Sequence, residues 1–437
     1  MTEIDSVPNE LTEIQGEVRK REVYHLSLLS EAVQISFSDL VSFQSWVGQK
    51  MKGIGLQIDE FTVDRDELAD QPAYQKTLRE NPTALKSGPN IVGRSSAEKH
   101  DGGILLFAHA DKFPQTFEWG KKHPHMTERN GKLFAPGIAD DVSGVTAMLS
   151  AIETFYRLRF EQKRNLMVAS VLGKQLGVFG TYGLMKRYKP MDAVIYVHPA
   201  ESGCGLNEIH MASNGMIEFS IEIEGKAPGT TDPFQTVYAK SAVNAAEKGV
   251  YLFQGLQTWA MESSKRYHHS NLQELVGQSF SLVVSRFNAG VENQVYEIPL
   301  RGILEGTVCF PPLLALKTVQ SDFKETFERL VKQDPWLAQS HVRLEWGDLI
   351  GDSAQSEERS TFLQTTSQVL AEVTGKKPHY QYGYSLSDIR YPLLSWKAES
   401  LGFGPVCGDI NKETEWVDRK EYLDSIVALT LILKQVL

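Results

Sequence analysis

The chain has 437 residues, a length that favours two domains over a single hydrophobic core. Its composition, 41% hydrophobic and 23% charged, is that of a folded globular protein. A net charge of -10 excludes nucleic acid as an expected partner, because phosphate binding needs a basic face. The three cysteines are few, odd in number and widely spaced, so we expect no disulfide framework.

The N-terminus is acidic and polar and lacks the apolar segment of a signal peptide. No run of about 18 apolar residues predicts a membrane span. We therefore expect a cytoplasmic protein with no membrane partner.

Strands and helices alternate through the first half of the chain. We predict a polar lead-in of about 20 residues, and a helical pair then follows from apolar residues at helical spacing. The expected strands are 56–63, 90–94, 104–107, 164–172 and 192–197, with a polar helical excursion or loop at 64–88 and helices at 24–52, 143–155 and 178–189. This alternation predicts a mostly parallel sheet covered by helices.

The pattern changes near residue 214, where residues 216–224 alternate strictly between apolar and polar. The expected elements that follow are helices 239–264 and 313–333 and strands 280–286, 303–308 and 342–346. Beyond them we expect a helix at 361–374, a short helix near 388, a strand at 400–403 and a terminal helix from 419. We predict an α/β domain in two parts, 1–213 and 349–437, with an inserted α+β domain at 214–348.

Two segments carry candidate chemistry. His109 and Asp111 follow a buried strand, and Asp140 and Asp141 precede a helix of small apolar residues. Functional side chains collect at such strand ends, and a histidine beside a carboxylate suits a metal centre. The alternative for each segment is a buried structural histidine and a helix-capping aspartate.

Together these segments resemble the dinuclear zinc exopeptidases and amidohydrolases, the group of acetylornithine deacetylase, succinyl-diaminopimelate desuccinylase, aminoacylase and glutamate carboxypeptidase. That family has H-x-D after a strand and G-x-A-D-D/M-x-G at a helix start, here 109–111 and 137–144. The resemblance implies a zinc-exopeptidase-like sheet with an inserted α+β lid or dimerisation domain. It also implies a homodimer and a small amino-acid-like or peptide ligand.

Carried over by position, the resemblance makes His109, Asp140 and His198 the metal ligands, with Asp140 as the bridge between two ions. Asp111 becomes the catalytic-site aspartate that orients His109. The resemblance also implies a cis peptide bond between Asp140 and Asp141.

The other half of the family's site is degraded. Lys174 replaces the general base, and Gln175 stands at a ligand position. The last histidine ligand is Ile410 or Asn411, depending on the register, since no histidine follows His379. The lid histidine is missing as well, and His210, His268 or His269 would replace it only after a rearrangement.

These losses predict at most one zinc ion per chain. Lys174 opposes a second divalent cation by like-charge repulsion. The alternative is no metal at all, with the Lys174 ammonium bonded to Asp140.

Arg390 and Asn293 match substrate-contacting positions of the family, and Arg390 suits a substrate carboxylate. The alternative for Arg390 is a structural ion pair with Asp388. We therefore expect a metallopeptidase or amidohydrolase relative with impaired activity on N-acyl amino acids or peptides. The second hypothesis is a non-catalytic relative, a pseudoenzyme, that binds such a ligand or a protein partner.

Overall fold

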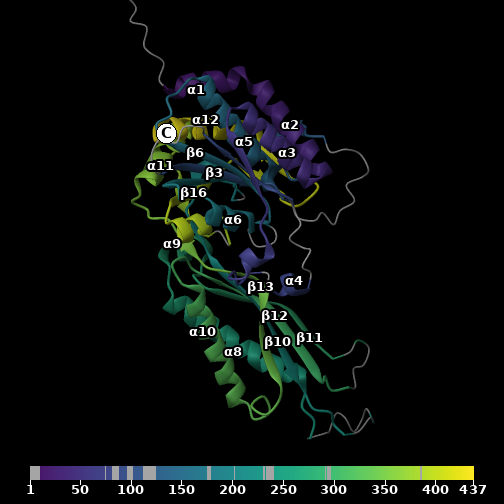
Figure 1. Ribbon diagram of the computed structural model, residues 1–437. Helices are drawn as coiled ribbons and strands as arrows, with labels where there is room; N and C mark the ends of the chain where they lie inside the picture. Colours follow the sequence, from purple (N-terminus) through teal and green to yellow (C-terminus); the bar gives the residue numbers. More distant parts are fainter. Residues whose placement is uncertain are drawn as a thin grey trace, which may run out of the picture.

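A computed structural model describes most of the chain, namely residues 10–73, 75–80, 88–95, 102–111, 125–174, 179–200, 202–229, 232, 241–290, 292, 297–383 and 386–437. Figure 1 shows a larger α/β lobe, which carries both the first helices and the C-terminus, and a smaller lobe below it.

The larger lobe is built on an eight-stranded sheet in the order β1-β2-β6-β3-β7-β16-β8-β15. Its strands are β1 (Gln57–Phe61), β2 (Asn90–Arg94), β3 (Gly103–His109), β6 (Asn165–Val171), β7 (Ala193–Val197), β8 (Glu208–His210), β15 (His379–Gln381) and β16 (Glu399–Phe403). The central strands β6, β3, β7 and β16 are parallel to one another, while β1 and β2 pair antiparallel. The predicted mostly parallel sheet is confirmed.

Helices cover both faces of this sheet (Figure 1). One face packs against α1 (Glu10–Lys20), α2 (Glu22–Ser38), α3 (Leu40–Gly53), α5 (Ser143–Arg157), α11 (Thr361–Thr374) and α12 (Arg419–Val436) in one continuous hydrophobic core. The other face packs against α6 (Phe179–Arg187) and the helical turn η5 (Pro392–Trp396) in a second core. The central strands are buried on both sides, which accounts for their nearly continuous apolar sequences.

Four predicted elements differ from the structure. The polar lead-in is wrong, because residues from Glu10 onward form α1 and bury Ile14 and Val18. The short helix expected near residue 388 lies a few residues later in the chain, with its helical turn at Pro392–Trp396. The helices expected from residues 239 and 313 begin at Ala245 and Leu316, with residues 233–240 outside the described part of the chain.

The smaller lobe is a four-stranded antiparallel sheet in the order β11-β12-β10-β13. Its elements are β10 (Gly215–Glu224), α8 (Ala245–Arg266), α9 (Ser270–Val276), β11 (Ser281–Ala289), β12 (Arg301–Phe310), α10 (Leu316–Gln333) and β13 (Val342–Gly351). The apolar residues of β10 turn inward and pack on α8 and α10 in their own core. The helix α4 (Gln75–Glu80) of the larger lobe contacts β13.

Short strands and turns complete the fold. One small sheet joins β4 (Thr127–Arg129), β5 (Lys132–Phe134), β18 (Trp416–Asp418) and β17 (Cys407–Gly408), and another pairs β9 (Ala212–Ser213) with β14 (Ala354–Gln355). The helical turns are η1 (Arg65–Leu68), η2 (Ile138–Val142) and η4 (Gly205–Asn207). Pairing of β18 with β5 brings the C-terminal segment against the loop that precedes η2.

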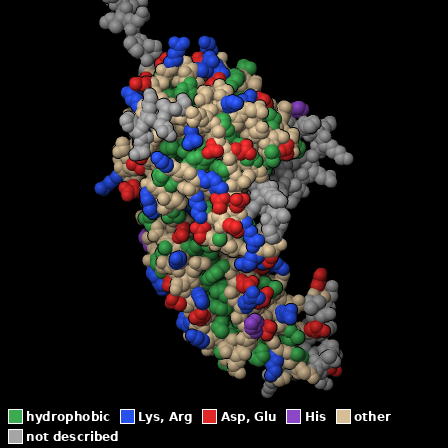
Figure 2. All heavy atoms as spheres, in the orientation of Figure 1, with side chains coloured by type: hydrophobic (Ala, Val, Ile, Leu, Met, Phe, Trp, Pro, Cys, Tyr) green, Lys and Arg blue, Asp and Glu red, His purple; other side chains and the backbone are tan. Residues whose placement is uncertain are grey.

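Acidic and basic side chains are interspersed over the face seen in Figure 2, with no large patch of one sign. Within the described part of the chain, no helix combines the length and apolar character needed to cross a bilayer.

Candidate active site at the carboxyl ends of the central strands

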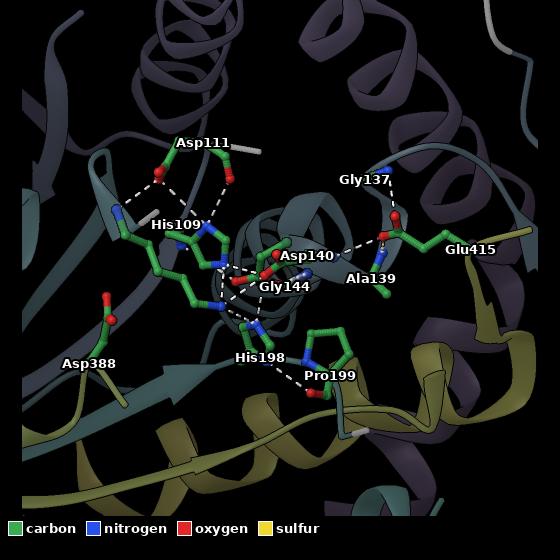
Figure 3. Close-up of polar contacts among 12 residues, drawn as sticks. His109, Asp111, Gly137, Ala139, Asp140, Gly144, His198, Pro199, Asp388 and Glu415 are labelled. Carbon is green, nitrogen blue, oxygen red and sulfur yellow. Dashed lines mark hydrogen bonds and ion pairs between the residues drawn. The ribbon is translucent and has the colours of Figure 1, made fainter. Parts of the chain in front are cut away.

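Three neighbouring parallel strands deliver the central side chains. His109 is the last residue of β3, His198 follows β7, and Lys174 lies three residues beyond β6. Parallel strands end at the same edge of a sheet, so these side chains converge there. Asp140 joins them from η2, at the start of α5 (Figure 3).

The ammonium group of Lys174 lies at the point of convergence. Its Nζ is 2.8 Å from Asp140 Oδ1, 2.9 Å from His198 Nε2 and 3.0 Å from His109 Nε2. Asp140 Oδ1 is also 2.9 Å from His109 Nε2 and 3.2 Å from His198 Nε2. An ammonium has three hydrogens to donate, and three acceptors surround it here.

Backbone carbonyls set the orientation of both imidazoles. His109 Nδ1 is 3.1 Å from Asp111 O, and His198 Nδ1 is 2.8 Å from Pro199 O (Figure 3). A carbonyl can only accept, so we assign the neutral tautomer with hydrogen on Nδ1 to both rings. Each Nε2 lone pair then faces Lys174. This is also the tautomer in which a histidine binds a metal through Nε2.

Charge fixes the protonation of the cluster. Burial raises the pKa of Asp140, but the Lys174 ammonium and His109 lower it more, well below its usual value. Burial and Lys174 lower the pKa of His198 to about 3, so this imidazole is neutral. Burial and Lys174 also lower the pKa of His109, but Asp140 and Asp111 raise it more, to about 10.

His109 and Lys174 therefore compete for one proton, because nitrogens 3.0 Å apart bond as donor and acceptor. Placing that proton on Lys174 gives every nitrogen in the cluster a partner. Placing it on His109 would leave Lys174 a neutral amine, although an amine is ordinarily a much stronger base than an imidazole. We infer an ammonium surrounded by two neutral imidazoles and one carboxylate.

Asp111 and Asp141 support this cluster. Asp111 Oδ1 accepts a hydrogen bond from the Lys174 backbone N–H at 3.2 Å, which ties the Lys174 turn to β3. Asp141 accepts from the backbone N–H groups of His109 and Gly144. Burial raises the pKa of Asp141 well above its usual value. The peptide bond between Asp140 and Asp141 is cis, as the resemblance to the zinc exopeptidases implies.

Glu415 holds the loop that carries Asp140, and sequence analysis missed it. Its carboxylate accepts from the backbone N–H groups of Gly137 at 3.1 Å, Ala139 at 2.7 Å and Asp140 at 3.1 Å (Figure 3). Burial raises the pKa of Glu415 to about 7. Glu415 directly precedes the three-residue strand β18, and a single glutamate at that position is a weak sequence signal.

The other predicted site residues lie apart from the cluster or outside the described residues. Arg390 is buried, with guanidinium nitrogens 3.4 Å from Ser387 O and from the Tyr391 hydroxyl. Among the described residues, Arg390 makes no ion pair with Asp388, whose Oδ2 accepts a hydrogen bond from the Thr181 hydroxyl. Asn411 is exposed, and Gln175 and Asn293 are outside the described part of the chain.

A metal ion would need the space that Lys174 fills. In the described residues, the donor atoms of His109, Asp141 and His198 all lie within 4.8 Å of one another, so this group could hold a metal. Two imidazoles and a carboxylate are also a donor set that zinc uses. The Lys174 Nζ, however, lies between both imidazoles and Asp140, in the space between these donor atoms.

Comparison with known proteins identifies the family of this chain. The profile of peptidase family M20/M25/M40 matches residues 105–437, and the chain belongs to this family. The match spans the site residues from His109 to Glu415. The chain is thus a peptidase- and deacylase-like member of a metal-binding hydrolase family.

Individual relatives are distant. The chain is 21% identical over 363 residues to N-formyl-4-amino-5-aminomethyl-2-methylpyrimidine deformylase of Halalkalibacterium halodurans, covering 78% of this chain and 81% of that protein. The solved aminopeptidase PepT of Bacillus cereus superposes with a TM-score of 0.68 at 15% identity, covering 94% and 97% of the two chains. The dipeptidase Dug1p of Saccharomyces cerevisiae gives 0.67 at 15% identity, covering 97% and 98%. These structural matches confirm the predicted fold.

Proposed function

We propose that the chain acts on the amide bond of a small N-acyl or N-formyl compound or a short peptide, with at most one zinc ion beside Asp140 and with impaired hydrolysis. Membership of the peptidase family supports the reaction class. Similarity to a deformylase over most of both chains supports a small substrate.

The observation that carries this proposal is the position of Lys174. Its Nζ lies within 3.0 Å of His109, His198 and Asp140, where one cation suffices to neutralise the carboxylate. A second divalent ion would lie close to the ammonium, and like charges at such a distance repel strongly in a buried site. Asn411, at a family ligand position, offers only an exposed carboxamide.

Binding of an ion requires Lys174 to leave the cluster. The Lys174 side chain is 19% exposed, so it has a route to solvent. Asp388 lies beside the cluster (Figure 3), and its buried Oδ1 has no hydrogen-bond partner within the described residues. The charge of Lys174 already lowers the pKa of Asp388 against the stronger raising effect of burial. We propose that Asp388 receives the displaced ammonium.

Each residue then has a defined task. A bound zinc ion would polarise the substrate carbonyl and a water molecule. His109, His198 and Asp140 would hold the ion, and Asp111 and Glu415 would keep His109 and Asp140 in position. No carboxylate replaces the family's general base at position 174, which is why we expect slow hydrolysis. Arg390 as a substrate contact stays a prediction.

Replacement of Lys174 tests the proposal. Lys174→Met removes the competing cation, so zinc affinity should rise by more than about tenfold. Lys174→Glu also supplies a carboxylate at the general-base position, so hydrolysis of N-formyl and N-acetyl amino acids should rise above the wild-type rate. Metal content by elemental analysis and amide hydrolysis would be measured on the same preparations.

Lys186→Met is the matched control, because Lys186 lies on α6 and pairs with Asp70, away from the cluster. The proposal fails if a crystal structure of the zinc-loaded wild type shows two zinc ions beside Asp140, or if Lys174→Met and Lys186→Met bind zinc equally well. Wild-type hydrolysis that persists in chelator would contradict the role of zinc.

The position of Lys174 also supports a second candidate function. In it, the site binds an amino-acid-like ligand without cleaving it. In that case calorimetry would detect binding of N-formyl and N-acetyl amino acids to metal-free wild-type protein, with the ligands recovered intact. Lys174→Glu would weaken that binding and add no hydrolysis, whereas the first candidate predicts a gain.

We also propose a homodimer formed through the smaller lobe. Support comes from apolar side chains of α8 and β11 that are 40–60% exposed, namely Val250, Met261, Val283 and Phe287. Such side chains gather at subunit interfaces. Light scattering after size exclusion should give twice the chain mass, and Met261→Glu with Val283→Glu should halve it. A monomeric wild type would contradict the dimer.

A further inference from the structure

A second group of metal-ligand side chains lies at the other end of the large sheet. It consists of Cys204, Glu208 and His379, whose ligand atoms all lie within 4.8 Å of one another. The strand β16 separates β8, which carries Glu208, from β7, which leads to His198. This group therefore shares no residue with the cluster around Lys174.

Strand pairing brings two of these residues together. β8 and β15 are parallel, and His379 is the register partner of Glu208. Register partners in adjacent strands point to the same face of a sheet, so the imidazole and the carboxylate lie side by side. His210, two residues along β8, faces the same way, and its Nε2 is 2.6 Å from Glu208 Oε1.

The turn η4 positions Cys204 beside Glu208 and His379. Cys204 directly precedes η4, and its backbone N–H donates to the Ser202 hydroxyl at 3.1 Å. The carboxylate of Glu421 on α12 accepts from the backbone N–H groups of Leu206 and Val406, which fixes the turn against the rest of the lobe. Hydrogen bonds therefore hold the segment that carries the Cys204 thiol in place.

An unsatisfied oxygen points to a missing cation. Glu208 is only 1% exposed, and its Oε2 has no hydrogen-bond partner among the described residues. The His379 imidazole lies beside this oxygen, with Nε2 at 3.4 Å from Oε2. A buried carboxylate oxygen without a donor is costly, and coordination to a metal removes that cost.

We propose that Cys204, Glu208 and His379 bind one zinc ion, with Glu208 Oε2, the Cys204 thiolate and an imidazole nitrogen as ligands and water in the fourth position. Thiolate, imidazole and carboxylate are the ligands that zinc takes in proteins. In a tetrahedral site with bonds of about 2.0–2.3 Å, ligand atoms lie roughly 3.3–3.8 Å apart, so a small contraction completes this group.

His210 is the positioning residue of this site. Its bond to Oε1 holds the carboxylate with Oε2 turned toward Cys204 and His379, as carboxylate–histidine pairs do around metals. The bound ion would join η4, β8 and the edge strand β15. The site should therefore stabilise the edge of the sheet, and its half-exposed His379 gives the ion access from solvent.

Zinc titration of the full-length chain tests the proposal. It would be done in a His109→Ala background, so that zinc bound at the cluster around Lys174 is not counted in the measured stoichiometry. One zinc ion per chain should bind, and Cys204→Ser and His379→Gln should each weaken binding by more than about tenfold, as expected for loss of one ligand. Cys309→Ser and His341→Gln are the matched controls and should leave the affinity unchanged.

Cobalt supplies a readout that identifies the ligand. Bound Co²⁺ should give a thiolate-to-metal charge-transfer band in the near ultraviolet, absent in Cys204→Ser and retained in Cys309→Ser. Zinc should also slow alkylation of Cys204 by iodoacetamide relative to Cys309, measured by peptide mass spectrometry. No zinc uptake, or uptake with neither the band nor protection of Cys204, would overturn the proposal.

Discussion

Glu415 links the last strands of the chain to the loop that carries Asp140. Replacing it by glutamine keeps one acceptor oxygen for Ala139 and Asp140 but turns an NH₂ group toward the Gly137 N–H. Glu415→Gln should therefore reduce the free energy of unfolding by about 1–3 kcal/mol, the cost of a buried unpaired donor. Urea unfolding followed by circular dichroism would measure the change.

Glu413→Gln is the control, because Glu413 is exposed in the same segment. It should leave the free energy of unfolding within about 0.5 kcal/mol of the wild type. Equal stability of Glu415→Gln and wild type would show that the carboxylate does not hold the loop.

His25 gives the protein a defined dependence on pH. Its ring nitrogens have no hydrogen-bond partner among the described residues, and burial, with Arg21, lowers the pKa of His25 to about 4. The unfolded chain binds this proton below about pH 6.5, whereas the folded chain does not until about pH 4. Stability due to His25 is thus complete above pH 6.5 and is lost as the pH falls toward 4.

The loss over that interval should approach about 3 kcal/mol, from the pKa difference. His25→Leu should unfold with a shallower pH dependence between pH 6.5 and 4, measured by urea denaturation at fixed pH values. The assignment would be wrong if wild type and His25→Leu showed parallel pH profiles.

The sequence predicts the candidate site only where its residues lie in local motifs. His109, Asp140 and His198 each stand at a strand or helix end that a local pattern reveals, and the structure brings them together. Glu415 escapes prediction because its partner Asp140 is 275 residues away in the chain. The contact depends on pairing of β18 with β5, which no local pattern specifies.

At the scale of elements, α1 shows why a polar segment can still be structural. Only Ile14 and Val18 are buried in it, one helical turn apart, and they pack with α12 in the main core. Leu11, Ile14 and Val18 lie at helical spacing, but three apolar residues among polar ones give only a weak periodicity. The buried strands and the long helix α12 were predictable because their apolar runs are long.

Ile14→Ala tests whether α1 stabilises the fold. Removal of a fully buried isoleucine side chain should cost about 2–5 kcal/mol, while Thr12→Ala on the exposed face should cost less than about 0.5 kcal/mol. Thermal unfolding by calorimetry would compare the two. If both variants melted like the wild type, α1 would contribute nothing to stability.

At the scale of the whole molecule, the sequence predicts the mixture of elements better than their order in space. The change from buried strands to an alternating strand at residue 216 indicates a separate sheet. The strand β10 does belong to a separate, four-stranded sheet. The placement of β16 between β7 and β8 could not be predicted, because it joins residues about 200 positions apart through non-local pairing.

The two lobes have separate hydrophobic cores, which predicts separate responses to core mutations. Phe323 of α10 and Phe155 of α5 are both fully buried, one in each lobe. Truncation of either phenylalanine to alanine should cost about 3–5 kcal/mol of local stability. Because cooperative units open separately, Phe323→Ala should mainly accelerate amide exchange in β10 and β12.

Phe155→Ala should accelerate exchange in β3 and β7 and leave β10 and β12 protected. Hydrogen–deuterium exchange with mass spectrometry resolves these peptides within one experiment on each variant. The chain continues twice between the lobes, at β10 and β13, and α4 adds contacts to β13. If those links dominated, both variants would accelerate exchange in all four strands equally, and the smaller lobe would not be a cooperative unit of its own.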